Sequence, residues 1–309
     1  MTFLHNSNTI QKSQEGLEEY IMKLSIESYV LVDRFGENKA IELAKNAGFD
    51  AIDYSLYWNN EKEEVLGDSY AEHAVELRKH LDNIGIECNQ AHAPFSLCYG
   101  CQFDITDQNY LWLTHSLEAA AILGAKNIIV HAITVPKEID FEEYNIHFYK
   151  SLIPYCEKFG IHIAVENLFH KDPETKKITG KIGSPDELNR IIAKIDSPWV
   201  VACVDVGHAA ITGNRPEDFI KNISPHILKA LHIQDNDLIS DRHIAPYTGE
   251  LNWKEIMKAL KEVNYKGELT FEVFAFLKKF PDDLIPEALK FVAAIGKHLV
   301  SIYDAASEA

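Results

Sequence analysis

The chain has 309 residues, 46% of them hydrophobic, which is enough for a large core and suits one α/β barrel of about 250 residues. Its 30 Lys and Arg stand against 47 Asp and Glu, a formal net charge of −17, which disfavours nucleic acid as a partner because nucleic-acid binders carry a basic footprint. No segment has the roughly 20 apolar residues needed to cross a bilayer, so we predict no membrane span.

Residues 1–21 are polar and lack the apolar stretch and cleavage site of a signal peptide. We predict that they form an N-terminal extension ahead of one barrel domain over residues 22–309. The cysteines are odd in number, and the C-x-x-C pair Cys98 and Cys101 has no second such pair. Reduced thiols in a cytoplasmic protein are therefore the prediction.

In the first half of the chain, short Ile- and Val-rich runs alternate with segments of helical periodicity, and a glycine follows each helix at position 48, 85, 124 or 160. Glycine at that position favours the left-handed backbone that ends a helix. The predicted strands span 22–28, 50–54, 86–92, 127–131 and 161–166. The predicted helices span 37–47, 69–83, 108–123 and 142–159.

The second half continues the alternation. A capping box of Ser184 and Glu187 predicts the start of a helix over 184–195. The remaining predicted strands are 199–205, 229–237 and 267–274, and the remaining helices are 216–223, 252–265 and 283–303. Eight strands separated by helices predict parallel pairing and a (β/α)8 TIM barrel. A doubly wound open sheet is the alternative, although no G-x-G-x-x-G follows the first strand.

Charged and imidazole side chains gather at the predicted carboxyl ends of the strands, where a TIM barrel places its functional site. We expect Gly207 to let the chain turn sharply after Asp205, so that His208 faces the same cavity. The candidate residues are His92, His131, Glu166, Asp205, His208, His232, Asp241, Arg242, His243 and Glu272.

Single histidines at strand ends are more often structural than functional, whereas buried carboxylates are more informative because unpaired burial is costly. Glu166 and Glu272 are flanked by apolar residues in IAVEN and LTFEV, and no Lys or Arg ends these strands. A bound metal cation would therefore compensate the charge of these two buried glutamates. Together with Asp205 and His232, the two glutamates suit one divalent ion, namely Mn2+, Mg2+, Co2+ or Zn2+.

Six motifs carry a resemblance to a known family: HAP at 92–94, VENL at 165–168, DVGHAAITG at 205–213, HIQDN at 232–236, DRHIAPYTGELNW at 241–253 and FEV at 271–273. With these motifs the chain resembles the xylose isomerase-like TIM-barrel superfamily of sugar isomerases and epimerases. That superfamily also includes apurinic/apyrimidinic endonucleases of the endonuclease IV type. The resemblance runs from about Met22 to the last helix.

The resemblance implies an enzyme that acts on a small sugar or sugar derivative and uses one metal ion, in the manner of a ketose 3-epimerase. Glu166 and Glu272 would lie on opposite faces of the substrate and would remove and return the proton next to the carbonyl. Loss of water after the same proton abstraction gives a dehydratase variant. Substrate contacts would come from His92, His131, His208, Asp241, Arg242 and His243. A homo-oligomer is also possible.

The endonuclease-like alternative needs three zinc sites. His92, His131 and Glu166 would form the first, and His208, Asp241 and His243 the third. The four predicted metal ligands would form the second. A metal-free enzyme like hydroxypyruvate isomerase and a sugar-binding or regulatory barrel without turnover are further alternatives.

Two loop features concern the substrate, whose identity and phosphorylation the sequence leaves open. The segment after the fifth strand contains Lys171, Lys176, Lys177 and Lys181, and we interpret it as a solvated loop in preference to a lid over an anionic sugar. Aromatic residues near the predicted mouth would stack on a sugar or shield the site from water: Tyr54, Tyr57, Trp58, Phe95 and Tyr99.

Overall fold

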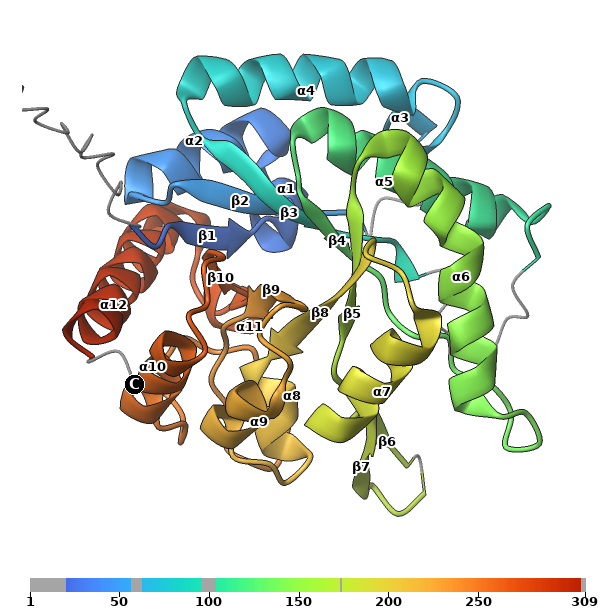
Figure 1. The fold of residues 1–309 in the computed structure, drawn as a ribbon. Helices are drawn as coiled ribbons and strands as arrows, with labels where there is room; N and C mark the ends of the chain where they lie inside the picture. Colours follow the sequence, from blue (N-terminus) through green and yellow to red (C-terminus); the bar gives the residue numbers. More distant parts are fainter. Residues whose placement is uncertain (1–20, 57–62, 96–103, 173, 307–309) are drawn as a thin grey trace, which may run out of the picture.

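The computed structural model describes residues 21–56, 63–95, 104–172 and 174–306. Eight parallel strands form the centre, and helices surround them (Figure 1). In the order of hydrogen-bonded neighbours, the strands are β10 (Leu269–Phe271), β1 (Leu24–Glu27), β2 (Ala51–Ser55), β3 (Glu87–His92), β4 (Asn127–Ile129), β5 (His162–Glu166), β8 (Val200–Asp205) and β9 (Leu228–His232).

The eight helices that the sequence predicts follow the strands in alternating order. They are α2 (Glu37–Ala47), α4 (Tyr70–Ile84), α5 (Gln108–Leu123), α6 (Phe141–Phe159), α7 (Pro185–Ile195), α9 (Pro216–Asn222), α10 (Trp253–Glu262) and α12 (Ile285–Ala305). Short helices lie at α1 (Tyr29–Phe35), α3 (Glu63–Leu66), α8 (Val206–Ile211) and α11 (Phe274–Leu277), with a 3-10 turn over Asp282–Leu284.

The two edge strands of the sheet, β9 and β10, meet and join it into a barrel. Ile233, the residue after β9, pairs in parallel with Phe271. The amide of Ile233 donates to the carbonyl of Thr270 at 2.7 Å, and the amide of Glu272 donates to the carbonyl of Ile233 at 3.0 Å. The predicted TIM barrel is confirmed, and the open-sheet alternative is wrong.

Successive side chains along each strand point alternately into the barrel and outward toward the helices. Ile128, Ile163, Ala202 and Leu231 belong to the large core cluster between strands and helices. Their neighbours form a separate small cluster of Ile129, Ala164, Val201, Cys203 and Ala230. Because side chains two residues apart share a face, Glu166, Asp205 and His232 continue the inner row from Ala164, Cys203 and Ala230. The interior therefore passes from apolar to charged at the carboxyl ends of the strands.

The predicted helix ends are confirmed. Gly48, Gly85, Gly124 and Gly160 all have positive φ. At the start of α7, the Ser184 hydroxyl accepts from the Glu187 amide at 3.3 Å, and the Glu187 carboxylate accepts from the Ser184 amide at 3.1 Å.

Several strands are shorter than predicted, among them β1, which spans Leu24–Glu27 and not 22–28. β4 ends at Ile129 and β10 at Phe271, so that His131 and Glu272 lie just beyond their strands. β9 ends at His232. The next residue, Ile233, pairs with Phe271 of β10, and the chain then enters the long loop before α10.

The expected role of Gly207 as a sharp turn is wrong. Gly207 lies within helix α8, and it is absent from the described glycines with positive φ. Space is the physical reason for glycine here, because a Cβ atom would lie 2.4 Å from Cδ of Gln234.

The segment after β5 is a β-hairpin, not the predicted loop. β6 (Leu168–Lys171) pairs antiparallel with β7 (Ile178–Lys181). Within it, Lys176 and Lys177 are exposed and Lys181 is partly buried.

Several sequence predictions fall on residues outside the described ranges. They concern the extension over residues 1–20, the pair Cys98 and Cys101, and the aromatic residues Tyr57, Trp58 and Tyr99. The described cysteines, Cys88, Cys156 and Cys203, are buried and free. Among the described residues, no helix combines the length and apolar character needed to span a membrane.

Candidate metal centre

Four side chains converge at the carboxyl end of the barrel. Glu166 ends β5, Asp205 ends β8, His232 ends β9, and Glu272 follows β10. All four are buried, and one potential ligand atom from each lies within 4.8 Å of those from the other three. The barrel thus brings together the four residues that the sequence predicts as metal ligands.

The imidazole of His232 lies between carboxylates. Its Nδ1 atom is 2.8 Å from Oε1 of Glu166 and 3.4 Å from Oε2 of Glu272. On the other side, Nε2 is 3.2 Å from Oδ2 of Asp53, which also accepts from the Gln90 amide at 2.8 Å. Asp53 was not among the predicted site residues. Its signal in the sequence was a carboxylate between Ile52 and Tyr54 in a strand, the pattern that pointed to Glu166.

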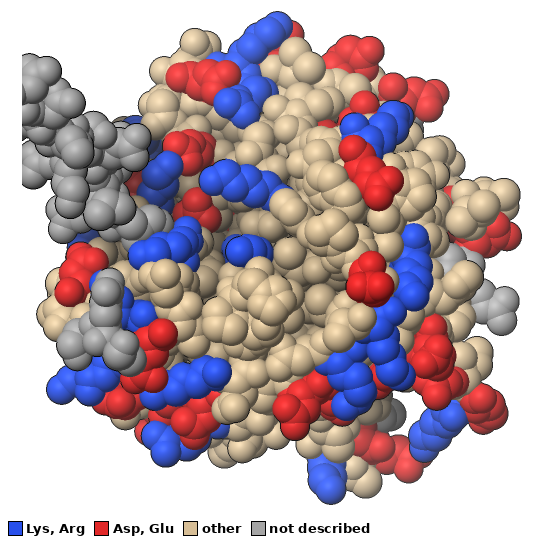
Figure 2. Space-filling model, viewed as in Figure 1, with Lys and Arg blue, Asp and Glu red and all other residues tan. Residues whose placement is uncertain are grey.

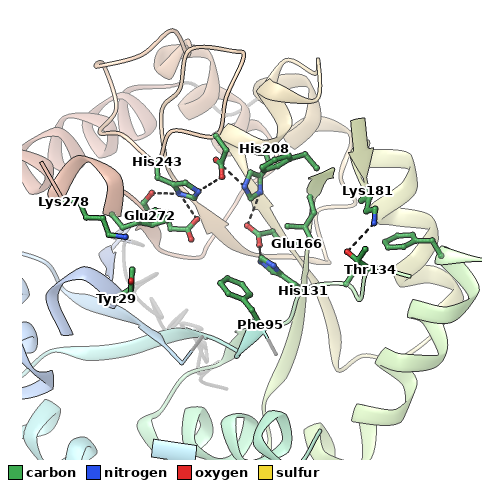
Figure 3. Close-up of a pocket in the computed structure, with 16 residues that line it drawn as sticks. Tyr29, Phe95, His131, Thr134, Glu166, Lys181, His208, His243, Glu272 and Lys278 are labelled. Atoms are coloured by element: carbon green, nitrogen blue, oxygen red, sulfur yellow. Dashed lines mark hydrogen bonds and ion pairs between the residues drawn. The ribbon is translucent and has the colours of Figure 1, made fainter. Parts of the chain in front are cut away.

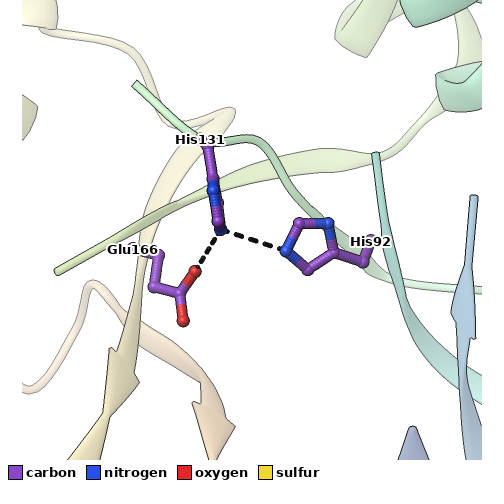
Figure 4. Close-up of side chains that lie close together, drawn as sticks. All are labelled: His92, His131 and Glu166. Carbon is purple, nitrogen blue, oxygen red and sulfur yellow. Dashed lines mark hydrogen bonds and ion pairs between the residues drawn. The ribbon is translucent and has the colours of Figure 1, made fainter. Parts of the chain in front are cut away.

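Glu166 also contacts a pair of histidines. The Nε2 atom of His131 lies 2.6 Å from Oε2 of Glu166 and 3.1 Å from Nε2 of His92 (Figure 4). His92 is buried, and its Nδ1 lies 3.0 Å from the Ala93 carbonyl oxygen. The three side chains form a second group with metal-ligand spacing.

A third group of this kind consists of His208, Asp241 and His243. The Nε2 atom of His243 lies 2.8 Å from Oδ2 of Asp241, and Nε2 of His208 lies 3.6 Å from Oδ1 of the same carboxylate. Nδ1 of His208 is 3.6 Å from Glu166. The third group is therefore adjacent to the predicted metal ligands.

Buried amides, which the sequence analysis missed, hold these groups in place. Gln234 donates to Asp241 at 2.8 Å and to Asp205 at 3.3 Å, while its carbonyl accepts from the amide of His243 at 3.0 Å. Asn167 exchanges two hydrogen bonds with the backbone of Asp205, at 2.8 and 3.0 Å. Asn167 belongs to the VENL motif and Gln234 to the HIQDN motif, but their roles depend on three-dimensional contacts.

Burial and neighbouring histidines shift the pKa values of the two glutamates in opposite directions. The pKa of Glu272 is raised to about 8, mainly by burial. The negative charges of Glu166 and Asp205 also raise it, while His232 and His243 lower it. Burial would also raise the pKa of Glu166, but His232 and His131 hold it well below 4.5. The raised pKa of Glu272 reflects its burial first and the neighbouring carboxylates second, and a bound cation would favour the ionised form of this side chain.

The donor set fits a divalent metal ion. Three carboxylates and an imidazole converge, and oxygen and imidazole ligands suit Mg2+, Mn2+, Co2+ and Zn2+. Asp53 beside Nε2 of His232 leaves Nδ1 facing the carboxylates, which is the usual arrangement of a carboxylate behind a metal-binding histidine.

A cavity of about 300 Å3 lies over this centre, a size that suits a small molecule. Figure 3 shows Lys278 and Tyr29 at one end and Lys181 and Thr134 at the other. Of the predicted site residues, those that line it are His131, Glu166, His208, Asp241, His243 and Glu272.

The remaining predicted site residues lie elsewhere. His92, Asp205 and His232 are buried but do not line the cavity. Arg242 does not line it either, and its guanidinium lies 3.3 Å from Asp237. Of the predicted aromatic residues, Phe95 lines the cavity, whereas Tyr54 is buried and contacts Glu37. The sequence analysis missed the lining residues Tyr29, Phe169, Phe274 and Lys278.

This fold and this site define a barrel with a candidate metal centre at its carboxyl end. The family model "xylose isomerase-like TIM barrel" matches residues 41–295, and the chain belongs to that family. The predicted resemblance is confirmed.

Among individual proteins, an uncharacterized protein of Methanocaldococcus jannaschii is 24% identical over 260 residues, which cover 81% of this chain and 83% of that protein. Fructoselysine 3-epimerase of Escherichia coli O157:H7 is 23% identical over 144 residues, 47% of this chain and 50% of that enzyme. The crystal structure of a D-tagatose 3-epimerase-like protein has a TM-score of 0.70 and 22% identity, covering 92% of this chain and 98% of its own.

Proposed function

We propose that this protein is a divalent-metal-dependent isomerase or epimerase of a small sugar or sugar derivative. The observation that carries the proposal is the convergence of Glu166, Asp205, His232 and Glu272 below a cavity of about 300 Å3. Family membership and the sugar 3-epimerases among its relatives support it.

Glu166, Asp205, His232 and Glu272 would hold the ion. When bound there, it would supply Lewis acidity that polarises the substrate carbonyl. Glu166 and Glu272 both line the cavity. In the proposal one of them removes the proton beside the carbonyl and the other returns a proton from the opposite face.

Neighbouring side chains prepare the two glutamates and the substrate. His131 and His232 hold the two carboxylate oxygens of Glu166 at 2.6 and 2.8 Å. His208, at the cavity wall, would donate a hydrogen bond to a substrate oxygen. Phe95 and Phe274 line the same cavity and would limit the access of water.

The first test is the metal content per chain, measured by mass spectrometry on protein purified without chelators or an affinity-tag metal. About one divalent ion per chain is the expected result. The second test is exchange of the proton next to the carbonyl, followed by NMR for a panel of ketoses in D2O. Appearance of a dehydrated product would indicate the lyase variant. Absence of metal, even after soaking with Mn2+, would contradict the proposal and favour a metal-free isomerase or a binding protein.

A second candidate, an endonuclease IV-like enzyme, is favoured by one observation. The groups His92, His131 and Glu166 and His208, Asp241 and His243 also have metal-ligand spacing. The net charge of −17 opposes it, and Figure 2 shows acidic and basic side chains mixed around the rim of one face. About three zinc ions per chain and cleavage of a duplex with an abasic site would support this candidate.

A further inference from the structure

We propose that the substrate carries a carboxylate or phosphate group, and that Lys181 binds this anion at the end of the cavity away from Lys278. The inference deepens the proposed function and rests on it, because it names the class of sugar derivative that the same cavity accepts.

Lys181 ends β7 and is a cationic residue of the cavity wall. Its Nζ atom donates to the hydroxyl of Thr134 at 3.4 Å and lies 5.3 Å from the centre of the Phe141 ring (Figure 3). Burial lowers the pKa of Lys181, and no described carboxylate contributes to that pKa. A partly buried ammonium group without an acidic partner is costly, and an anion in the cavity would offset that cost.

The backbone around Lys181 is fixed from several sides. Gly180 and Gly183 lie so close that a Cβ on Gly180 would be 2.6 Å from Cα of Gly183. Ile182, between Lys181 and Gly183, is buried. The Gly183 amide donates to Glu187 at 2.9 Å, and its carbonyl accepts from Asn214 at 2.8 Å. The Lys181 backbone is therefore held in place where its ammonium group reaches the cavity, which favours a binding site over a solvated surface charge.

The other lysine of the cavity differs in ways that favour Lys181 as the anion site. Lys278 is exposed, and its Nζ lies 4.7 Å from the centre of the Tyr29 ring and 5.2 Å from that of Phe274. Water and two aromatic faces already surround this ammonium group. Lys181 lacks comparable exposure and has a hydroxyl beside it that would donate a second hydrogen bond to an anion.

The test compares three ketoses that differ only at carbon 6: D-fructose, D-fructuronate and D-fructose 6-phosphate. Binding to the metal-loaded protein is measured by calorimetry. We expect at least one anionic ketose to bind roughly tenfold or more tightly than D-fructose, as for a hydrogen bond to a charged group. Tighter binding of D-fructuronate would indicate a carboxylate site, and tighter binding of D-fructose 6-phosphate would indicate a phosphate site. The variant Lys181→Met keeps the aliphatic stem over Phe141, and it should lose this preference.

Lys177→Met is the matched control, because Lys177 lies exposed on the same hairpin and does not line the cavity. It should keep the preference, and thermal unfolding checks that both variants are folded. The inference is overturned if the wild type shows no preference, whether all three ketoses bind equally or none binds. A preference that survives Lys181→Met overturns it as well. If the protein turns over only neutral ketoses, the proposed function is supported and the anion site is contradicted. If anionic ketoses bind in a Lys181-dependent way but show no proton exchange, the anion site is supported and the proposed function is contradicted.

Discussion

The Nε2 atom of His232 lies 3.2 Å from the carboxylate of Asp53, in a buried contact between β9 and β2 across the barrel interior. A carboxylate at this place accepts the Nε2 proton, so that the opposite ring nitrogen, Nδ1, is directed at Glu166 2.8 Å away. A bound cation would take the place of the Nδ1 proton. Asp53 is therefore a positioning residue for the proposed metal centre, although it does not line the cavity.

Asp53→Asn should weaken metal binding by about 10- to 100-fold, which is the usual effect of losing a carboxylate behind a ligating histidine. The substitution keeps the size of the side chain and removes its charge. Metal affinity is measured by competition with a chelating dye. Asp50→Asn is the control, because Asp50 lies exposed just before the same strand and accepts from the backbone of Leu24 at 2.9 Å. Equal affinities of the two variants would show that Asp53 does not position His232.

Glu166→Gln and Glu272→Gln should each abolish turnover, with a rate loss of about 10²-fold or more because each removes a group that transfers a proton. His243→Ala should weaken turnover only modestly, since His243 is neither a proposed metal ligand nor one of the two proton-transferring glutamates, although its Nδ1 lies 3.4 Å from Oε2 of Glu272. The measurement is the rate of proton exchange beside the carbonyl in D2O. A Glu272→Gln protein with normal activity on its substrate would refute the two-carboxylate scheme.

The alternation of strands and helices could be predicted from sequence because local signals mark several helix boundaries, such as Gly85 after α4 and the capping box at Ser184 before α7. The candidate metal ligands could be predicted because Glu166 and Glu272 interrupt apolar runs. Strand lengths could not be predicted, because β4 and β10 end where their pairing with neighbouring strands stops. That depends on long-range contacts, and periodicity does not report them.

The supporting residues were beyond sequence reasoning for a different reason. In the sequence, nothing distinguishes Gln234 from other polar residues. Only the folded chain places its side chain against both Asp205 and Asp241. Lys181 stood among four lysines of one segment, and the pairing of β6 with β7 decides which of them reaches the cavity.

Glu142 gives a prediction for the pH dependence of stability. Hydrogen bonds from Arg190 and Lys194, both at 2.8 Å, lower its pKa from 4.5 to about 2 and link α6 to α7. Because the folded-state pKa is depressed, this contribution to stability is present above about pH 4.5 and is lost as the pH falls towards 2. Glu142→Gln should lower the free energy of unfolding at pH 7 by less than about 1 kcal/mol, since the pairs are exposed. Urea unfolding of both proteins should show this gap narrowing from pH 5 to pH 3, and a gap that widens on acidification would contradict the assignment.

Gly207→Ala should destabilise the protein by about 1–3 kcal/mol, the usual cost of overpacking a buried site. The new Cβ would lie 2.4 Å from Cδ and 2.7 Å from Oε1 of Gln234, and Gln234 is fully buried with no room to retreat. Its displacement would disturb the hydrogen bonds to Asp205, Asp241 and the amide of His243. The free energy of unfolding is measured in urea, and metal affinity should fall together with it.

The double variant Gly207→Ala/Gln234→Ala tests this explanation, because removal of the Gln234 side chain returns the space that the new methyl group needs. Residues in contact give non-additive effects, and here the double variant should lose less stability than the sum of the two single variants. If Gly207 were required for backbone flexibility and not for the close approach of Gln234, the losses in free energy of unfolding of the two single variants would add in the double variant. Additivity within about 0.5 kcal/mol would therefore reject the packing explanation.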